Sequence, residues 1–241
     1  TLYFLEGIPY FIVNQISVIM LTKMGVPNGE MAFFTSWLYL PWMIKPFWSP
    51  FIDIFKTKRW WTISMQLVMS MAFIALVMSI PHPDPALIAS GQTPISLFYV
   101  TLILFVIIAF ASATHDIAAD GFYMIALNPG DQALFVGIRS TFYRLSGIFG
   151  QGALVGLAGY IELTHDNIPM SWTITMICSA LILCLLTLYH IFILPKPKSD
   201  TSVLKDDKKA TVSEIMSEFA NAFKTYFMKP GVWLAIVFML L

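Results

Sequence analysis

Long apolar runs of about 20 residues, the length that crosses a bilayer as α-helix, alternate with short polar breaks along this chain. At ~1.5 Å of rise per residue, such a run matches the ~30 Å hydrocarbon core of a membrane. The pattern predicts six spanning helices in up-and-down order, at residues 2–22, 31–51, 60–80, 94–127, 132–160 and 171–194. Gly, Pro and Asn gather in the breaks, as in Asn128-Pro129-Gly130, and favour turns there.

Composition supports an all-α polytopic membrane protein. The chain is 58% hydrophobic and 12% charged, with a mean hydropathy of +0.75, values outside the range of soluble domains. Its formal net charge is +0, so nothing favours a nucleic-acid surface. Cys178 and Cys184 lie six residues apart in one apolar run, on opposite sides of a helix, and are expected to be free thiols. We expect no cofactor and no metal site.

The basic residues predict the orientation in the membrane. Lys56, Lys58 and Arg59 lie between the second and third spans, and a run of lysines from Lys196 to Lys229 follows the sixth. The alternate loops carry essentially only Lys23. The positive-inside rule therefore places the basic loops, and the start of the first span, on the cytoplasmic side.

Residues 195–230 are predicted to form a cytoplasmic linker. Its first part is polar, and its second part has an amphipathic helical pattern behind a possible Thr211-x-x-Glu214 capping box. That helix is expected either to lie on the membrane face or to pack against other cytoplasmic loops. Residues 231–241 resemble the start of a seventh spanning helix.

The fourth and fifth spans contain charges deep in the apolar pattern. Asp116 and Asp120 share a helix face, and His115 points about 100° away from Asp116. In an antiparallel hairpin turning near residue 130, Asp116 lies level with Arg144 and Asp120 with Arg139. Because the two arginines diverge by about 140° around their helix, we expect one close ion pair and one arginine directed elsewhere.

These charges allow several interpretations. A buried ion pair that only fixes helix packing is one, and a proton or substrate pathway is another. His115 is either a proton carrier or a hydrogen-bonded packing residue. An intramembrane enzyme that uses His115, Asp116 and Asp120 as acid, base or metal ligands is a rival from a different class.

The first span adds Glu6, Asn14 and Gln15, with Gly7 and Pro9 placed to disturb the helix. Polar groups beside a disturbed helix often line a transport cavity, although interhelical hydrogen bonding explains Asn14 and Gln15 equally well. In the fifth span, Gly152-x-x-x-Gly156 predicts close packing against a neighbour. Lys45 is expected to extend to the cytoplasmic interface.

Five segments carry a resemblance to a known group of proteins. They are Phe4 to Tyr10, Phe33 to Trp37, Lys45 to Asp53, the Ala-Thr-His-Asp-Ile-Ala-Ala-Asp-Gly string at 113–121, and Arg139 to Gly152. Together they resemble the muropeptide permease (AmpG-type) and acetyl-CoA transporter branch of the major facilitator superfamily. The resemblance covers most of residues 3–194, and the Thr-x-Asp-Ile-Ala-x-Asp and Lys-Pro-Phe-Trp-Ser-Pro patterns are its most specific parts.

The resemblance implies that residues 1–194 form the N-terminal six-helix half of a twelve-helix transporter and that the start of helix seven follows. The C-terminal half of that transporter is the missing partner of the bundle. It implies proton-coupled import of a muropeptide through the bacterial inner membrane, with acetyl-CoA or another solute as the alternative. Candidate pathway residues are Glu6, Asn14, Gln15, His115, Asp116, Asp120, Arg139 and Arg144. Asp53, Lys56, Lys58 and Arg59 correspond to a gating loop.

The chain departs from the family pattern at three places. Ile54-Phe55-Lys56 replaces the usual Arg and Gly after Asp53, His115 replaces a frequent Gln, and Glu6 stands where the acetyl-CoA branch tends to have Gln. The working hypothesis is that Asp116 or Asp120 responds to protons, held near an arginine in one state and released in the other.

Overall fold

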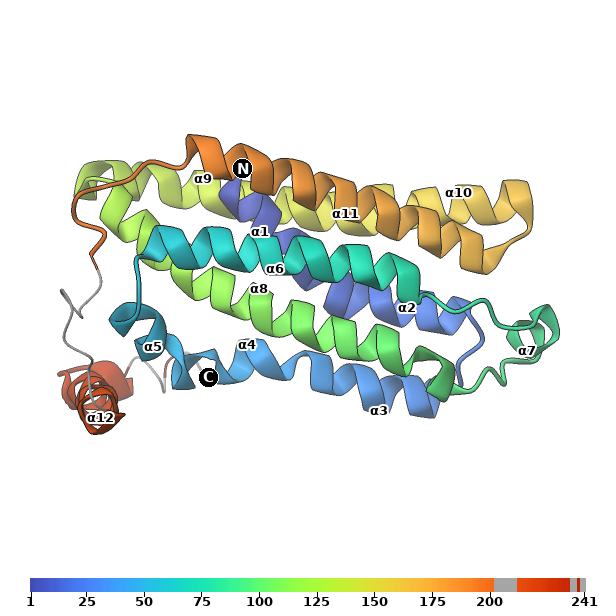
Figure 1. Ribbon diagram of the computed structural model, residues 1–241, viewed down its shortest axis with the longest axis horizontal. Helices are drawn as coiled ribbons and strands as arrows, with labels where there is room; N and C mark the ends of the chain where they lie inside the picture. Colours follow the sequence, from blue (N-terminus) through green and yellow to red (C-terminus); the bar gives the residue numbers. More distant parts are fainter. Residues whose placement is uncertain (202–211, 235–237, 239–241) are drawn as a thin grey trace.

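The computed structural model of the chain describes residues 1–201, 212–234 and 238. The chain is 84% helical, and no strand occurs in those residues. Six long helical segments lie side by side along the long axis of the molecule, with a small helix, α12, at one end (Figure 1). The prediction of an all-α polytopic membrane protein is confirmed.

The helix bounds follow the predicted runs within a few residues, except in the second run. The segments are, in order, α1 (Leu2–Phe11), a π-helical turn (Ile12–Ile16) and α2 (Ser17–Lys23); α3 (Asn28–Leu38), α4 (Leu40–Ile44), a 3-10 turn (Lys45–Phe47) and α5 (Ser49–Ile54); α6 (Lys58–Ser79); α7 (Pro85–Ser90) in a loop; a 3-10 turn (Ile95–Phe98) and α8 (Tyr99–Ala126); α9 (Pro129–Ile148), a π-helical turn (Phe149–Leu154) and α10 (Val155–His165); α11 (Ile168–Ile193); and α12 (Val212–Met228). Polar caps fix several starts: the side chain of Thr57 accepts from the Trp60 amide, and that of Asn167 from the Met170 amide.

Four of the six segments are long and apolar enough to cross a membrane: Leu2–Lys23, Lys58–Ser79, Ile95–Ala126 and Ile168–Ile193. The predicted spans at 31–51 and 132–160 are not among them. The 31–51 run is divided into short helices, and the 132–160 run is more polar and contains Arg139 and Arg144. That these two segments also cross the bilayer stays a prediction.

Prolines explain where the helices deviate from regular geometry. Pro9 removes a backbone donor inside α1, and a π-helical turn begins three residues later. Pro41, Pro46 and Pro50 each stand at the first or second position of a new short element, which divides the second segment into α4, the 3-10 turn and α5. The expected disturbance of the first span is therefore present, one turn beyond Gly7 and Pro9.

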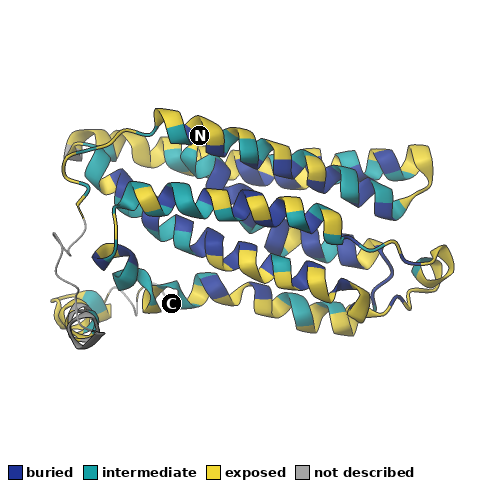
Figure 2. Ribbon diagram, viewed as in Figure 1, coloured by how far each residue is buried: buried dark blue, intermediate teal, exposed yellow. Residues whose placement is uncertain are grey.

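The apolar core lies along α1 at the centre of the bundle. Leu5, Ile12 and Ile16 have no exposed surface, and α1 packs against α8, α9 and α11 while α6 packs against α8 and α11. The outward faces remain exposed and apolar, for example at Met78, Leu163 and Phe192 (Figure 2). Apolar exposure on this scale suits lipid contact and supports a multi-pass membrane protein.

Helices α1 and α9 approach each other closely at two glycines. A Cβ placed on Gly7 would lie 1.8 Å from the Ser146 Oγ, and one on Gly147 would lie 2.7 Å from the Phe11 ring. At Gly152 and Gly156, by contrast, no described atom lies within 4 Å of such a Cβ. The prediction that Gly152-x-x-x-Gly156 forms the close contact is wrong within this chain, because the helices meet one to two turns earlier.

Helix α12 packs against α5 and the turn before it. The rings of Phe219 and Phe51 lie 5.3 Å apart, and those of Phe223 and Phe47 lie 6.1 Å apart. The amphipathic helix therefore packs against the second helical segment, and its place on the membrane face or against other cytoplasmic loops stays a prediction. The predicted capping box of Thr211 and the Glu214 side chain lies outside the described residues, as does most of the 231–241 segment and residues 202–211 of the linker.

Replacing Gly7 by Ala tests the contact between α1 and α9. The added methyl group overlaps Ser146, and overpacking of this kind costs about 1–3 kcal/mol of stability. We expect a lower thermal midpoint for the detergent-solubilised G7A protein, measured by fluorescence-detected gel filtration after heating, and recovery in G7A/S146G.

Gly152→Ala is the matched control, because the same change there meets no neighbour and adds helix propensity. It should leave the midpoint unchanged or raise it. Equal midpoints for G7A and G152A would show that α1 and α9 do not meet at Gly7.

Candidate functional site

A cluster of charged side chains lies where α1, α8, α9 and the 3-10 turn before α5 come together. Glu6 comes from α1, Asp116 and Asp120 from α8, Arg139 and Arg144 from α9, and Lys45 from the turn. Three carboxyl groups thus stand among three cations inside an apolar bundle. Ionisable groups in a membrane span mark a functional site by default, because leaving them unpaired there is costly.

Asp120 and Arg139 form the expected single close pair. The Arg139 Nη1 lies 3.1 Å from the Asp120 Oδ1, and the Tyr3 hydroxyl donates to the same oxygen at 2.9 Å. The guanidinium also lies over the rings of Tyr3 and Tyr123, at 4.9 and 5.4 Å from their centroids, a favourable cation–π geometry. Asp120 and Arg139 are level with each other, as the hairpin register predicts.

Asp116 pairs with Lys45 and not with an arginine. The Lys45 ammonium donates to the Asp116 Oδ2, across the interface between the second segment and α8. The expectation that Lys45 extends to the interface is therefore wrong: Pro46 begins a tight turn that aims the side chain into the bundle. Lys45 thus joins the charged cluster.

Arg144 is the arginine directed elsewhere. Among the described residues it forms no ion pair and no hydrogen bond, and it lines a hollow of about 230 Å³ together with Glu6, Asp116, Asp120 and Arg139. Tyr3, Ser140 and Tyr143 complete the lining. The hollow therefore presents one cation without a protein partner.

A second hollow, of about 300 Å³, shares Glu6, Asp116 and Tyr143 with the first. Its other walls are Tyr10, Tyr39, Trp42 and Lys45. The Tyr10 and Trp42 rings meet edge to face, with centroids 5.2 Å apart. The two hollows together make one site with a charged part and an aromatic part, and Glu6 and Asp116 stand at their junction.

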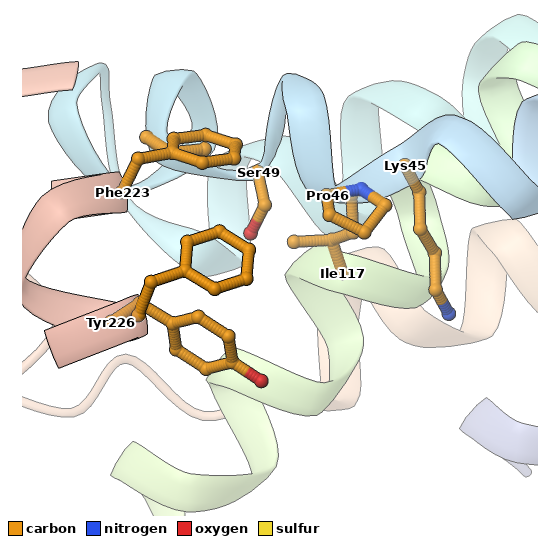
Figure 3. Close-up of a pocket in the computed structure, with 8 residues that line it drawn as sticks. Lys45, Pro46, Ser49, Ile117, Phe223 and Tyr226 are labelled. Atoms are coloured by element: carbon orange, nitrogen blue, oxygen red, sulfur yellow. The ribbon is translucent and has the colours of Figure 1, made fainter. Parts of the chain in front are cut away.

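A third hollow, of about 380 Å³, lies beside the cluster and is almost entirely apolar. Phe223, Tyr226 and Phe227 of α12 line one side, and Pro46, Ser49 and Ile117 lie opposite (Figure 3). The side chain of Lys45 borders this hollow with its stem while its ammonium points away from the α12 rings toward Asp116. Lys45 therefore lines both the apolar hollow and the charged site.

Glu6 differs from the other two carboxylates in having no cation partner among the described residues. It is 7% exposed, and its Oε2 is fully buried without a hydrogen bond. Both aspartates, in contrast, have a cation within salt-bridge distance. Glu6 is therefore the unpaired carboxyl group of the cluster.

His115 lies outside this site, in a buried polar chain between α8, α6 and α11. Its Nε2 is 2.9 Å from the Gln66 Nε2, the Gln66 Oε1 is 3.2 Å from the His190 Nδ1, and the His190 Nε2 is 3.1 Å from the Thr1 Oγ1. His115 has no exposed surface. The structure thus separates it from the aspartate face, as the helical angle predicts, and gives it a hydrogen-bonded packing environment.

Asn14 and Gln15 lie away from the charged hollows. The Asn14 amide donates to the Tyr10 carbonyl of its own helix at 3.0 Å, within the π-helical turn, and Gln15 is exposed. Neither lines the two hollows that contain Glu6. Their place in a transport pathway stays a prediction.

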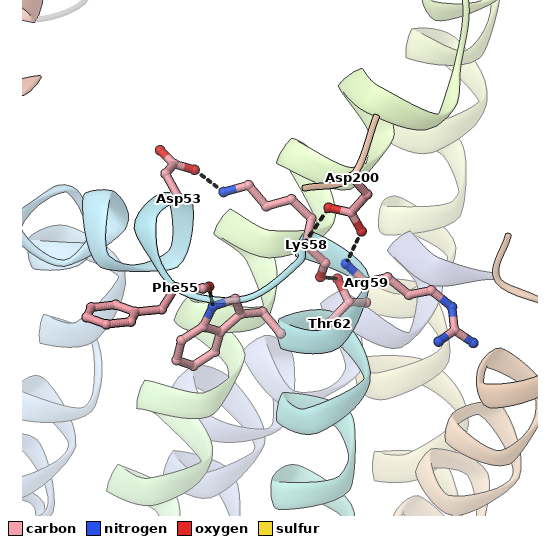
Figure 4. A network of polar contacts seen from close by, with 7 residues as sticks. Asp53, Phe55, Lys58, Arg59, Thr62 and Asp200 are labelled. Atoms are coloured by element: carbon pink, nitrogen blue, oxygen red, sulfur yellow. Dashed lines mark hydrogen bonds and ion pairs between the residues drawn. The ribbon is translucent and has the colours of Figure 1, made fainter. Parts of the chain in front are cut away.

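The predicted gating loop is held by several polar contacts (Figure 4). The Lys58 ammonium pairs with Asp53, and the Arg59 guanidinium donates to the Ile191 and Leu194 carbonyls at 2.8 and 3.1 Å. Lys56 takes a positive φ of 57°, a conformation that favours glycine, in the turn between α5 and α6. The loop therefore fastens the start of α6 to α5 and to the end of α11.

Asp200, in the linker after α11, adds a long-range contact to this loop. Its carboxylate accepts from the Lys58 and Arg59 backbone amides at 2.7 and 3.0 Å. These amides stand at the N-terminus of α6, where no helix carbonyl can pair with them, and a negative charge there is favourable. Asp200 thus attaches the linker to the loop between α5 and α6 and the start of α6.

Four residues that take part in these polar networks were not predicted from the sequence. Gln66 and His190 are polar residues inside apolar runs, so the depth rule that singled out His115 also applies to them. Tyr3 and Asp200 carry no local signal, because each acts through a partner more than 100 positions away.

Replacing Asp200 by Ala tests the attachment of the linker. Removing a helix-capping carboxylate costs about 1 kcal/mol locally, so we expect the Lys58 and Arg59 amides to exchange hydrogen for deuterium faster in D200A. Asp131→Ala, an exposed aspartate in the first turn of α9, is the control and should leave those amides unchanged. Unaltered exchange in D200A would show that the linker is not attached through Asp200.

The comparisons with known proteins agree with the motif resemblance. Two proteins named "Putative transporter AmpG 4", from Rickettsia conorii and Rickettsia felis, are each 26% identical to this chain over 97% of its length. An uncharacterized protein of Haemophilus influenzae is 24% identical over 98% of the chain. The chain spans about half the length of these curated relatives, 53% of each Rickettsia protein and 50% of the Haemophilus protein.

No protein-family model matches the chain, and no solved structure matches it. The shared sequence nonetheless runs through all six helical segments, since the alignments cover nearly the whole chain. The resemblance predicted from the motifs is thereby confirmed: this multi-pass membrane protein is similar, over nearly all of its length, to AmpG-type transporters.

Proposed function

We propose that the chain forms part of a secondary active transporter that works by alternating access. The observation that carries the proposal is the charged site between α1, α8 and α9, where Lys45–Asp116 and Arg139–Asp120 pairs border two connected hollows inside an apolar bundle. A site that only fixed helix packing would fill its space with side chains. Hollows lined by charged and aromatic groups suit a polar solute.

A second half of the transporter is the proposed partner of this bundle. The relatives are about twice as long as the chain, and most of α9, which carries both arginines, is exposed or half-buried, with Ser146 and Gly147 buried against α1. Leu134, Val136 and Ile148 on α9 are exposed, and a facing bundle would cover them. We therefore propose that the chain forms the N-terminal six-helix half of the transporter and that the linker leads to the second half.

The proposed substrate is a muropeptide or a related sugar-containing solute, imported through the bacterial inner membrane with protons. The names of the Rickettsia relatives and the motif resemblance support this choice, and Tyr10, Tyr39 and Trp42 offer aromatic faces on which a sugar ring can stack. Acetyl-CoA or another solute is the alternative within the same fold. An enzyme that uses His115 with the aspartates is disfavoured, because His115 faces Gln66 on the other side of α8.

The two ion pairs are proposed to rearrange during the transport cycle. In a low-dielectric site an ion pair is stable only while both partners face each other, so a solute or a proton that neutralises one partner releases the other. Helices α8 and α9 then have two alternative sets of contacts, which is the requirement for two discrete states.

The experiment that tests the substrate is a panel uptake assay on the full-length protein in proteoliposomes. Labelled N-acetylglucosaminyl-anhydro-N-acetylmuramyl peptide, a simple disaccharide and acetyl-CoA are offered in turn, with and without an imposed pH gradient. Gradient-driven accumulation of the muropeptide alone is the expected result. Accumulation of acetyl-CoA in place of the muropeptide would favour the alternative, an acetyl-CoA transporter. Conversion of any probe to a new compound would favour an intramembrane enzyme.

Neutralising the aspartates tests the role of the ion pairs. Asp116→Asn leaves Lys45 without its partner, and Asp120→Asn leaves Arg139 with the Tyr3 hydroxyl and the rings of Tyr3 and Tyr123. The Asp116 side chain is 15% exposed and that of Asp120 is 44% exposed, so water compensates less at Asp116. We expect the initial rate of uptake to fall at least ~10-fold in D116N and less in D120N, since an unpaired buried charge is strongly destabilising.

Asp131→Asn serves as the control, because this exposed aspartate lies far from the hollows at the start of α9. Its uptake rate should equal that of the unmodified protein. Full pH-gradient-driven accumulation in both D116N and D120N would show that these pairs take no part in transport.

A further inference from the structure

The charged site is balanced only if Glu6 is counted. Glu6, Asp116 and Asp120 stand against Lys45, Arg139 and Arg144, three carboxyl groups against three cations. Two of the carboxylates are matched to two of the cations by direct contact. One carboxyl group, Glu6, and one cation, Arg144, remain without partners among the described residues.

Glu6 is held where an ionised carboxylate is poorly stabilised. Its Oε2 is buried and accepts no hydrogen bond, and the residues around it on α1 are Leu5, Gly7 and Ile8, all buried. A carboxylate in such a place needs a cation or donors, whereas a protonated carboxyl group needs far less. The geometry therefore suits a proton on Glu6 in this conformation.

Most of the other charged groups around Glu6 already have partners in this structure. From α8 and the turn before α5, Asp116 and Lys45 face each other, and Asp120 faces Arg139 of α9. The phenol groups of Tyr3, Tyr10, Tyr39 and Tyr143 also line the hollows. On α11, His190 contacts Gln66 and Thr1. Arg144 is therefore the one cation in the hollows that an anion can approach without first breaking a pair among the described residues.

We infer that Glu6 is the proton carrier of the site and that Arg144 binds an anionic group of the substrate. When Glu6 holds a proton, the six groups carry a net charge of one positive unit, and a carboxylate or phosphate of the solute restores neutrality at Arg144. When Glu6 gives up that proton, its carboxylate supplies the missing negative charge, and the anionic solute loses its electrostatic advantage. Binding of the proton and of the anion thus favour each other, which is the condition for symport.

This inference rests on the proposed function, and it moves the proton-responsive role from the aspartates to Glu6. Asp116 and Asp120 keep the role of ion-pair partners. A Glu at this position also departs from the Gln that the acetyl-CoA branch tends to have there.

The test compares two activities of the full-length protein in proteoliposomes, with labelled N-acetylglucosaminyl-anhydro-N-acetylmuramyl peptide as the probe. One is exchange of labelled for unlabelled probe without a pH gradient, and the other is accumulation driven by a pH gradient. Glu6→Gln mimics the protonated carboxyl group at almost the same size. We expect E6Q to exchange the probe at a rate close to that of the unmodified protein, with little dependence on pH, and to lose gradient-driven accumulation completely.

Glu162→Gln is the matched control, because this carboxylate pairs with Lys23 at the other end of the bundle. It should retain both activities. Accumulation in E6Q equal to that in E162Q would overturn the inference, and so would loss of exchange in E6Q alone, since Glu6 would then be needed for translocation itself.

Arg144 is tested by binding rather than transport. In R144Q we expect the dissociation constant of the probe to rise about tenfold, as befits a lost charge-assisted hydrogen bond, while a probe whose carboxyl groups are amidated binds the variant and the unmodified protein equally. Equal weakening for both probes would remove the anion-binding role. If the unmodified protein neither exchanges nor accumulates the probe, the proposed function fails instead, and the outcome is distinct from that of E6Q.

Discussion

The cost of placing charge in an apolar interior governs the arrangement of this bundle. Asp116 and Asp120 lie one helical turn apart in α8, and each has drawn a cation from a different segment, Lys45 from the second and Arg139 from the fifth. These two contacts connect the broken second segment and helix α9 to the same face of α8. The same requirement explains why Tyr3 and Tyr123 surround Arg139, since a guanidinium shared by a carboxylate and two ring faces is well satisfied.

Prolines supply the geometry that electrostatics then uses. Without the 3-10 turn that contains Lys45 and Pro46, Lys45 would continue along a regular helix, and nothing would direct its ammonium toward α8. Pro9 and the π-helical turn after it rotate the remainder of α1 relative to its start, so that Glu6 and Asn14 do not line the same hollow. Local backbone irregularity therefore decides which polar residues line the site and which form hydrogen bonds only within their own helix.

Much of this arrangement can be predicted from the sequence, and the predictions that are wrong have identifiable physical reasons. Hydrophobic runs and turn residues locate the helices, and the hairpin register places Asp120 beside Arg139, because both depend on local periodicity. Lys45 is predicted to extend to the cytoplasmic interface but pairs with Asp116, because its direction depends on a turn that periodicity does not describe. Gly152 and Gly156 suggested a close contact, but small residues permit an approach without causing one, and the helices cross at Gly7 and Ser146.

The contact at Gly7 also limits how the site can move. Because there is no room for even a methyl group between α1 and α9 at this level, the two helices cannot slide or rotate past each other without first separating. Glu6 adjoins Gly7 on one helix, and Arg144 lies two residues before Ser146 on the other. The proposed proton-binding and anion-binding groups are therefore carried on two helices in tight contact at this level, so we expect the coupling between them to act mainly through the electric field.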